Sequence, residues 1–151
     1  MAAIVTVLRR LAAFAAAASV VALAGCGSGP SDADRAAWAQ WSDAVVASTP
    51  GNAAAGQLTA VEGGVGVTID FPSATTFRAI ELRCIGADRA QFALAYTAGG
   101  ETLTTSQDIV CQKGALRTPI AIPSAVKSLT SVTVSATSPE GTGMWTAQLQ
   151  K

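Results

Sequence analysis

The chain has 151 residues, half of them hydrophobic, with ten basic and ten acidic side chains and no histidine. This length suits one folded domain with a tether, and it is too short for two domains. The lack of histidine excludes a Ser-His-Asp triad and a Cys-His pair, and the lack of any Lys/Arg run excludes the basic surface that binds nucleic acid.

Residues 1–25 have the pattern of a secretory signal peptide. Arg9 and Arg10 form a positive n-region, and an uncharged stretch rich in Ala, Val and Leu follows over 11–23. A membrane span needs about 20 apolar residues, so this stretch is too short for one. One interpretation of this segment is an ordinary secreted protein with a chance cysteine near its cleavage site. The sequence leaves general and twin-arginine export open.

Leu23-Ala24-Gly25-Cys26 resembles the lipobox of bacterial lipoproteins at all four positions. The resemblance implies diacylglycerol on the Cys26 sulfur, cleavage before Cys26, and a protein anchored by lipid on the extracytoplasmic face of the cell membrane. Two or more acyl chains hold a protein stably, whereas one holds it only marginally. Cleavage would remove Arg9 and Arg10 and leave eight basic residues against ten acidic ones, a net charge of −2.

The cysteine count supports this interpretation, because lipidation of Cys26 leaves one pair, Cys84 and Cys111. Outside the cytoplasm we expect these two to form a disulfide. The pair closes a loop of 27 residues, for which the chain-entropy estimate of the stabilisation is about 3.5 kcal/mol. The rival interpretation is a zinc site, but two thiols without histidine leave zinc short of ligands. We therefore expect neither a metal nor another cofactor.

Residues 26–56 are predicted to form a tether that contains one short amphipathic helix, over 31–47. Ser31 and Asp34 have the spacing of a capping box, and Pro50 follows the predicted end of the helix. The Ala/Gly-rich stretch 52–56 is predicted to be a linker.

Trp38, Trp41 and Val45 fall on one face of the predicted helix. The two tryptophans could lie in the bilayer interface, where this residue is enriched, or pack on the body of the domain. Interfacial helices usually carry basic residues on the polar face. This helix carries mostly aspartate there, so packing on the body is favoured.

Residues 57–151 change to a period of two and predict seven or eight short strands separated by Gly, Pro, Ser and Asp. The alternating apolar positions are Val65, Val67, Ile69 and Phe71; Ile80, Leu82 and Cys84; Phe92, Leu94 and Tyr96; Ile120 and Ile122; Val132 and Val134; and Trp145, Ala147 and Leu149. Glu81 and Arg83 are expected to face solvent. The pattern predicts a mainly β protein, an antiparallel β-sandwich of either jelly-roll or immunoglobulin-like topology. Cys84 and Cys111 would join two strands or two sheets.

The body is similar to small exported domains of actinobacterial lipoproteins in its Ala-rich composition and its cysteine pair. This similarity implies no activity and names no family for the mature domain.

Two groups of residues are candidates for chemistry. Ser124 and Lys127 match S-x-x-K and resemble the nucleophile motif of penicillin-binding proteins and β-lactamases, but no S-D-N or K-T-G accompanies them. The alternative is a capped turn after Pro123. Asp88, Glu101 and Asp108 could meet at one sheet edge and bind Ca²⁺, but no dense Asp-x-Asp loop supports this.

The aromatic residues Trp38, Trp41, Tyr96 and Trp145 are the candidate contacts for a ligand or an interface, although alternation favours a core position for Tyr96 and Trp145. The sequence as a whole predicts a non-catalytic, lipid-anchored envelope lipoprotein that binds a protein or an envelope glycan or lipid. The alternative is a small hydrolase with an atypical site at Ser124 and Lys127. A concave, aromatic-lined pocket would favour a small ligand, and a flat apolar patch would favour a protein partner.

Overall fold

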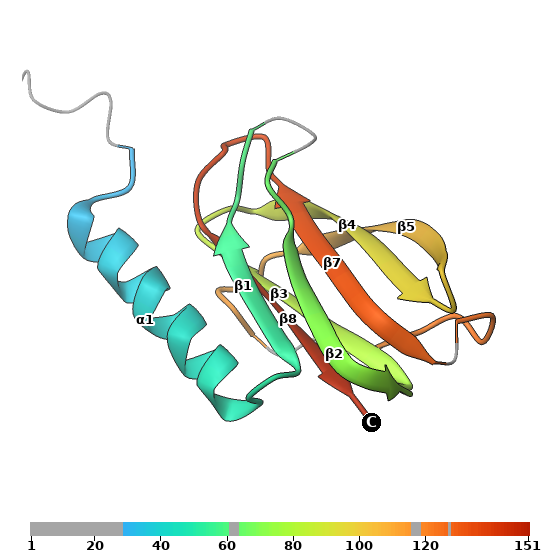
Figure 1. Ribbon diagram of the computed structural model, residues 1–151. Coiled ribbons are helices and arrows are strands. Elements are labelled where there is room, and N and C mark those ends of the chain that lie inside the picture. Colours follow the sequence, from blue (N-terminus) through green and yellow to red (C-terminus); the bar gives the residue numbers. More distant parts are fainter. Residues whose placement is uncertain (1–28, 61–63, 116–118, 127) are drawn as a thin grey trace, which may run out of the picture.

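The computed structural model describes residues 29–60, 64–115, 119–126 and 128–151. Within these ranges, two four-stranded antiparallel sheets pack face to face, and one helix lies against the outside of one sheet (Figure 1). The predicted β-sandwich with a preceding helix is therefore confirmed.

The elements fall into a helix, α1 (Asp32–Ser48), and two sheets. The helix-side sheet has the spatial order β1 (Ala53–Gln57), β8 (Met144–Gln150), β3 (Ala79–Ile85) and β6 (Ile120–Ala121). The open sheet has the order β2 (Val67–Thr75), β7 (Leu129–Thr137), β4 (Arg89–Ala98) and β5 (Glu101–Val110). No helix among the described residues is long and apolar enough to span a membrane.

The strand order identifies the topology. The chain pairs as one long antiparallel hairpin, in which the first strand pairs with the last and the fourth with the fifth: β1–β8, β2–β7, β3–β6 and β4–β5. The pairs β3–β8 and β4–β7 complete the two sheets. A long hairpin rolled up in this way is a jelly roll. The two topologies that the sequence left open are thereby reduced to one.

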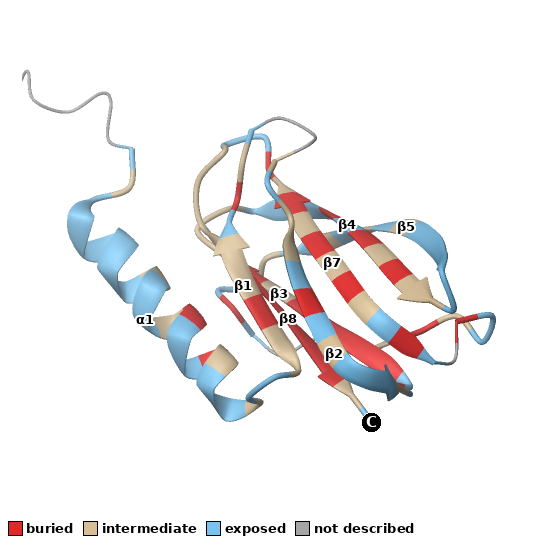
Figure 2. Cartoon of the chain, in the orientation of Figure 1, coloured by how far each residue is buried: buried red, intermediate tan, exposed pale blue. Residues whose placement is uncertain are grey.

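The core lies between the sheets, and buried residues alternate with more exposed ones along β4 and β7 (Figure 2). In β4, Phe92, Leu94 and Tyr96 are each no more than 1% exposed. Across the sandwich, the ring of Trp145 meets Phe92 edge to face at a centroid distance of 6.1 Å. Large aromatic rings of this kind contribute much of the apolar area that stabilises a small domain.

The outer face of the helix-side sheet is also buried, which corrects one prediction. Glu81 is only 7% exposed, and Arg83 is half-buried, although both were expected to face solvent. Arg83 Nη2 lies 2.9 Å from Glu81 Oε2 and donates to Gln148 Oε1 at 2.8 Å. Because α1 packs on this sheet, the residues opposite the core are shielded as well. The strand β8 shows the same effect, with five consecutive buried residues.

Three boundaries differ from the prediction. The predicted linker over 52–56 is wrong, because β1 occupies Ala53–Gln57 and pairs with β8. A small residue is required there: a methyl group built on Gly56 would lie 2.7 Å from the ring of Trp145. The helix begins and ends one residue later than predicted, and the strand expected to include Val65 begins at Val67, leaving Val65 96% exposed.

The predicted disulfide between Cys84 and Cys111 is confirmed, with a Cα–Cα distance of 4.8 Å. Cys84 lies in β3 of the helix-side sheet, and Cys111 directly follows β5 of the open sheet. The bond therefore joins the two sheets and not two strands of one sheet.

Candidate functional site

The helix α1 begins with the capping box that the sequence predicted. Asp34 N donates to Ser31 Oγ at 3.1 Å, and Ser31 N donates to Asp34 Oδ2 at 3.0 Å. The Ser31 side chain, followed by its backbone N–H, lowers the pKa of Asp34 below its ordinary value. The carboxylate also lies at the positive end of the helix dipole. These bonds fix where the helix starts relative to the tether.

The other end of α1 is held by a side chain from β8. Gln148 Nε2 lies within hydrogen-bonding distance of Val45 O at 3.3 Å, Ser48 Oγ at 3.1 Å and Thr49 Oγ1 at 2.9 Å. Gln148 itself is 6% exposed. The last carbonyls of a helix lack partners within the helix, so this contact both satisfies the end of α1 and ties it to the sheet.

Two tryptophans of α1 rest on two glycines of the sandwich. A methyl group built on Gly86 would lie 2.8 Å from the ring of Trp38, and one built on Gly114 would lie 2.6 Å from the ring of Trp41. Both rings are half-buried. The structure therefore places both tryptophans against the body, as favoured from the sequence, and leaves part of each ring accessible.

An open pocket of about 550 Å³ lies beside Trp38. We call it the Trp38 pocket. Its walls are Trp38 from α1, the β3–β4 turn over 85–88, and three side chains from the loops at this end of the sandwich: Cys111, Lys113 and Glu140.

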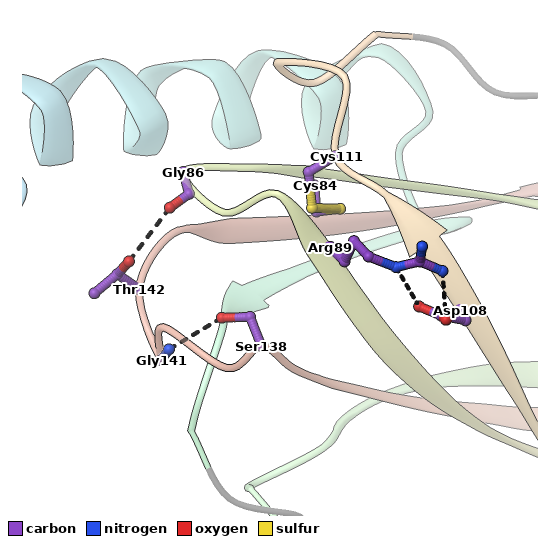
Figure 3. Close-up of a disulfide and its surroundings, with 8 residues drawn as sticks. All are labelled: Cys84, Gly86, Arg89, Asp108, Cys111, Ser138, Gly141 and Thr142. Atoms are coloured by element: carbon purple, nitrogen blue, oxygen red, sulfur yellow. Dashed lines mark hydrogen bonds and ion pairs between the residues drawn. A yellow bond between two sulfur atoms is a disulfide. The ribbon is translucent and has the colours of Figure 1, made fainter.

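The frame of the Trp38 pocket is fixed by covalent and hydrogen bonds (Figure 3). The disulfide joins its two sides, and Cys111 N donates to Asp88 O at 2.8 Å. The β7–β8 loop is tied to the same turn, because Thr142 Oγ1 donates to Gly86 O at 3.3 Å. A frame of this kind holds a site in its binding geometry before the ligand arrives, which reduces the entropy lost on binding.

Lys113 adopts an unusual backbone conformation at the rim of the pocket. Among the described residues other than glycine, it alone has a positive φ, of 50°. Its N–H donates to Cys111 O at 2.9 Å, and the next N–H, of Gly114, donates to Cys84 O at 3.0 Å. A left-handed conformation costs a residue with a β-carbon about 1–2 kcal/mol. Strain of this type is commonly retained at functional sites.

The charges of the pocket come from side chains that are open to solvent. Asp88, Lys113 and Glu140 are all exposed. None of them forms an ion pair with another described residue. The Trp38 pocket therefore combines one aromatic edge with two carboxylates and one ammonium group that are available to a ligand.

Two of the predicted contact residues are not in any accessible site. Tyr96 and Trp145 are each 1% exposed, because their alternating positions face the core. Trp145 Nε1 donates to Gln57 O at 3.2 Å, and burial raises the pKa of Tyr96 to about 12. Of the four candidate aromatic contacts, only Trp38 lines the pocket.

The three acidic residues that could have met at one edge do not come together. Asp108 pairs with Arg89 at 2.6 Å. Glu101 lies at the opposite end of the β4–β5 hairpin, next to the turn. No group of three or more potential metal-ligating His, Cys, Asp or Glu residues occurs within the described ranges.

Two other predictions fall wholly or partly outside the described residues. Cys26 and the segment 1–25 lie outside them, and so does Lys127. Ser124 is exposed in a turn in which Val126 N donates to Pro123 O at 3.0 Å. A Ser124–Lys127 site stays a prediction.

Sequence reasoning missed the Trp38 pocket because its walls come from four separate segments. The available signal was the pairing of tryptophans on α1 with glycines in loops, but only the fold shows which glycine lies beneath which ring. No protein-family model matches the chain, and no curated protein matches it either. What the pocket binds must therefore follow from its own chemistry.

Proposed function

We propose that the protein is a non-catalytic binding module, anchored by lipid on Cys26 at the extracytoplasmic face of a bacterial membrane, and that the Trp38 pocket binds an envelope glycan. The anchor is supported by the resemblance of Leu23-Ala24-Gly25-Cys26 to a lipobox. The glycan is supported by one observation: a half-buried tryptophan is surrounded by exposed charged groups on a cross-linked frame.

The chemistry of the pocket matches a sugar better than an acyl chain. A sugar ring offers a face of C–H groups to an aromatic ring and hydroxyl groups to charged partners. Asp88 and Glu140 can accept hydrogen bonds from hydroxyls, and Lys113 can donate to a ring or carboxylate oxygen. An acyl chain offers these three groups no hydrogen-bonding partner, and it would need a more enclosed apolar cavity.

The position of the pocket along the chain also fits a ligand near the membrane. Six residues, 26–31, precede α1, and extended chain spans at most about 3.5 Å per residue. The start of the helix would then lie within roughly 20 Å of the lipid. Trp38 lies six residues further on, about 9 Å along the helix axis. The pocket would be within reach of glycans close to the bilayer.

The anchor is tested by mass spectrometry of the N-terminal peptide from the full chain expressed in a bacterial host supplied with labelled palmitate. We expect the label on Cys26, and we expect the Cys26→Ser variant to leave the membrane fraction. An unmodified Cys26 in a soluble mature protein would overturn the anchor while leaving the pocket untested by that result.

Binding is tested on the full chain with fractionated envelope glycans, by calorimetry, using Asp88→Asn and Glu140→Gln. Removing one charge-assisted hydrogen bond should weaken binding roughly tenfold. Glu101→Gln is the matched control, because this exposed acid lies at the far end of the β4–β5 hairpin. The glycan proposal fails if no fraction binds, or if the control weakens binding as much as the pocket variants.

A further inference from the structure

The four outer strands of the two sheets differ in how they are protected. β6 has two residues, and β1 has five and lies beside α1 (Figure 1). β2 carries Pro72, and its register with β7 shifts between Asp70 and Thr75. Short length, proline and irregular register are features that prevent an edge strand from pairing with another chain.

β5 has none of these features. It runs for ten residues in unbroken register with β4, from Glu101 to Val110. It contains no Lys, Arg or Pro, and residues 102–107 carry no charge. Most of its residues are exposed, as Figure 2 shows. A long, regular edge whose central residues carry no charge is a template for another strand.

The hairpin geometry shows which backbone groups of β5 point away from β4. Gly99 and Gly100 have φ values of 58° and 86°, as in a two-residue type I′ turn, so Ala98 and Glu101 form a hydrogen-bonded pair. Bonded and non-bonded pairs then alternate along the ladder. The hydrogen bond from Cys111 N to Asp88 O shows that the same alternation of bonded and non-bonded pairs reaches the end of the hairpin far from the turn. Even-numbered residues from 102 to 108 therefore direct N–H and C=O outward.

We propose that β5 pairs antiparallel with β5 of a second copy of this chain, around a two-fold axis through Thr105. In this register, residue 102 of one copy faces residue 108 of the other, and residue 104 faces residue 106. The outward N–H and C=O groups of the two strands can therefore hydrogen-bond to each other. The open sheets of the two copies join into one continuous sheet of eight strands. This inference goes beyond the glycan binding proposed above and does not depend on it, but the concentration that favours the dimer rests on the lipid anchor proposed there.

The charges on β5 are compatible with this register. Asp108 lies opposite Thr102 of the second copy, where the hydroxyl can donate to the carboxylate, and Glu101 lies opposite Ile109. No two acidic residues face each other, although like charges directly opposite one another destabilise a sheet. This register pairs residues 101–109 of the two strands and gives about eight inter-strand hydrogen bonds.

The expected strength follows from the size of the contact. Pairing along a single edge buries less than the roughly 1,200–2,000 Å² of a stable interface. The dimer is therefore weak in dilute solution and forms where the protein is concentrated. Attachment of both copies to one membrane would supply that concentration.

Disulfide cross-linking of the full chain in intact cells tests both the pairing and its register. Residue 105 faces its own copy as a non-bonded pair, for which Cα atoms lie about 4.5 Å apart, within disulfide range. We expect Thr105→Cys to form a covalent dimer under mild oxidation. Thr102→Cys is the matched control, because it is more exposed but faces Asp108, and it should cross-link at least fivefold less. The unmodified chain controls for cross-linking through Cys26.

A second substitution asks whether the backbone of the edge is needed. Ser106→Pro, added to Thr105→Cys, removes an outward N–H and no bond to β4, so it should abolish the covalent dimer while circular dichroism stays unchanged. Ser106→Ala keeps the N–H and should keep the dimer. The proposal is overturned if the 105 and 102 variants cross-link equally, if neither cross-links, or if the 105 variant links only to a different protein.

Discussion

Lys113 is the residue at which stability and function are expected to conflict. Its φ of 50° is costly for lysine and ordinary for glycine, while its side chain stands at the rim of the Trp38 pocket. A strained residue that evolution could relieve with one substitution is more easily explained by what its side chain contacts than by what it contributes to folding.

We expect Lys113→Gly to raise the free energy of unfolding by about 0.5–1 kcal/mol, because the relief of strain exceeds the entropy that glycine loses on folding. The same variant should weaken glycan binding. Lys113→Ala is the control: it removes the charge and keeps the strain, so it should weaken binding without the gain in stability. Denaturant titration measures the first effect and calorimetry the second. A destabilised glycine variant would contradict the assignment of strain.

Side-chain alternation in the sequence predicted the core face of several strands correctly, as Phe92, Leu94 and Tyr96 illustrate, but it failed at Val65 and at β1. It could not predict that Glu81 and Gln148 are buried on the opposite face. Alternation states which residues share a face of a strand, but it carries no information on whether a helix from elsewhere covers that face. Thr146, with no exposed surface and no partner for its hydroxyl among the described residues, is buried for the same reason.

At the scale of the element, α1 is held by contacts at two glycines and at its C-terminal end. We expect Gly114→Ala to displace the ring of Trp41, since the added methyl would lie 2.6 Å from it. Gly114→Ala should lower the free energy of unfolding by about 1–3 kcal/mol more than Gly51→Ala does, which is the usual range for overpacking. Gly51 is a matched control because its φ of 75° nearly equals the 76° of Gly114, while nothing lies within 4 Å of its added methyl.

Denaturant unfolding measures this difference in stability, and tryptophan fluorescence reports the environment of the ring. The emission should shift to longer wavelength in Gly114→Ala and stay unchanged in Gly51→Ala. Equal losses of stability in the two variants would show that backbone strain, and not contact with Trp41, explains the effect.

The sequence predicted α1 well because its start depends on local chemistry, the bonds between Ser31 and Asp34. It failed at β1 because an Ala/Gly-rich pentapeptide has little strand propensity of its own. β1 forms because all five of its residues pair with residues of β8 and because Gly56 leaves room for the ring of Trp145. Elements that depend on a distant partner are those that a local pattern does not reveal.

For the whole molecule, the disulfide is a covalent cross-link between the two sheets in addition to the loops of the chain. We expect Cys84→Ala combined with Cys111→Ala to lower the free energy of unfolding by about 3.5 kcal/mol, from the 27-residue separation. For a domain of this size the melting temperature should fall by roughly 10 °C. Thermal unfolding with and without reductant measures both. Reductant should lower the melting temperature of the wild type to that of the double variant and leave the double variant unchanged.

The pairing of β1 with β8 also sets the order in which the molecule can be completed. β8 follows the seven other strands of the described part of the chain, yet it lies inside the helix-side sheet, between β1 and β3, and holds the end of α1 through Gln148. A chain in which only the elements up to β7 have folded therefore has a first helix and a first strand that still lack their main partner. Assembly of this sheet waits for β8, and such distant contacts make folding slow. A chain without β8 would lose an interior strand of the helix-side sheet, and β1 and β3 would both lose a partner strand.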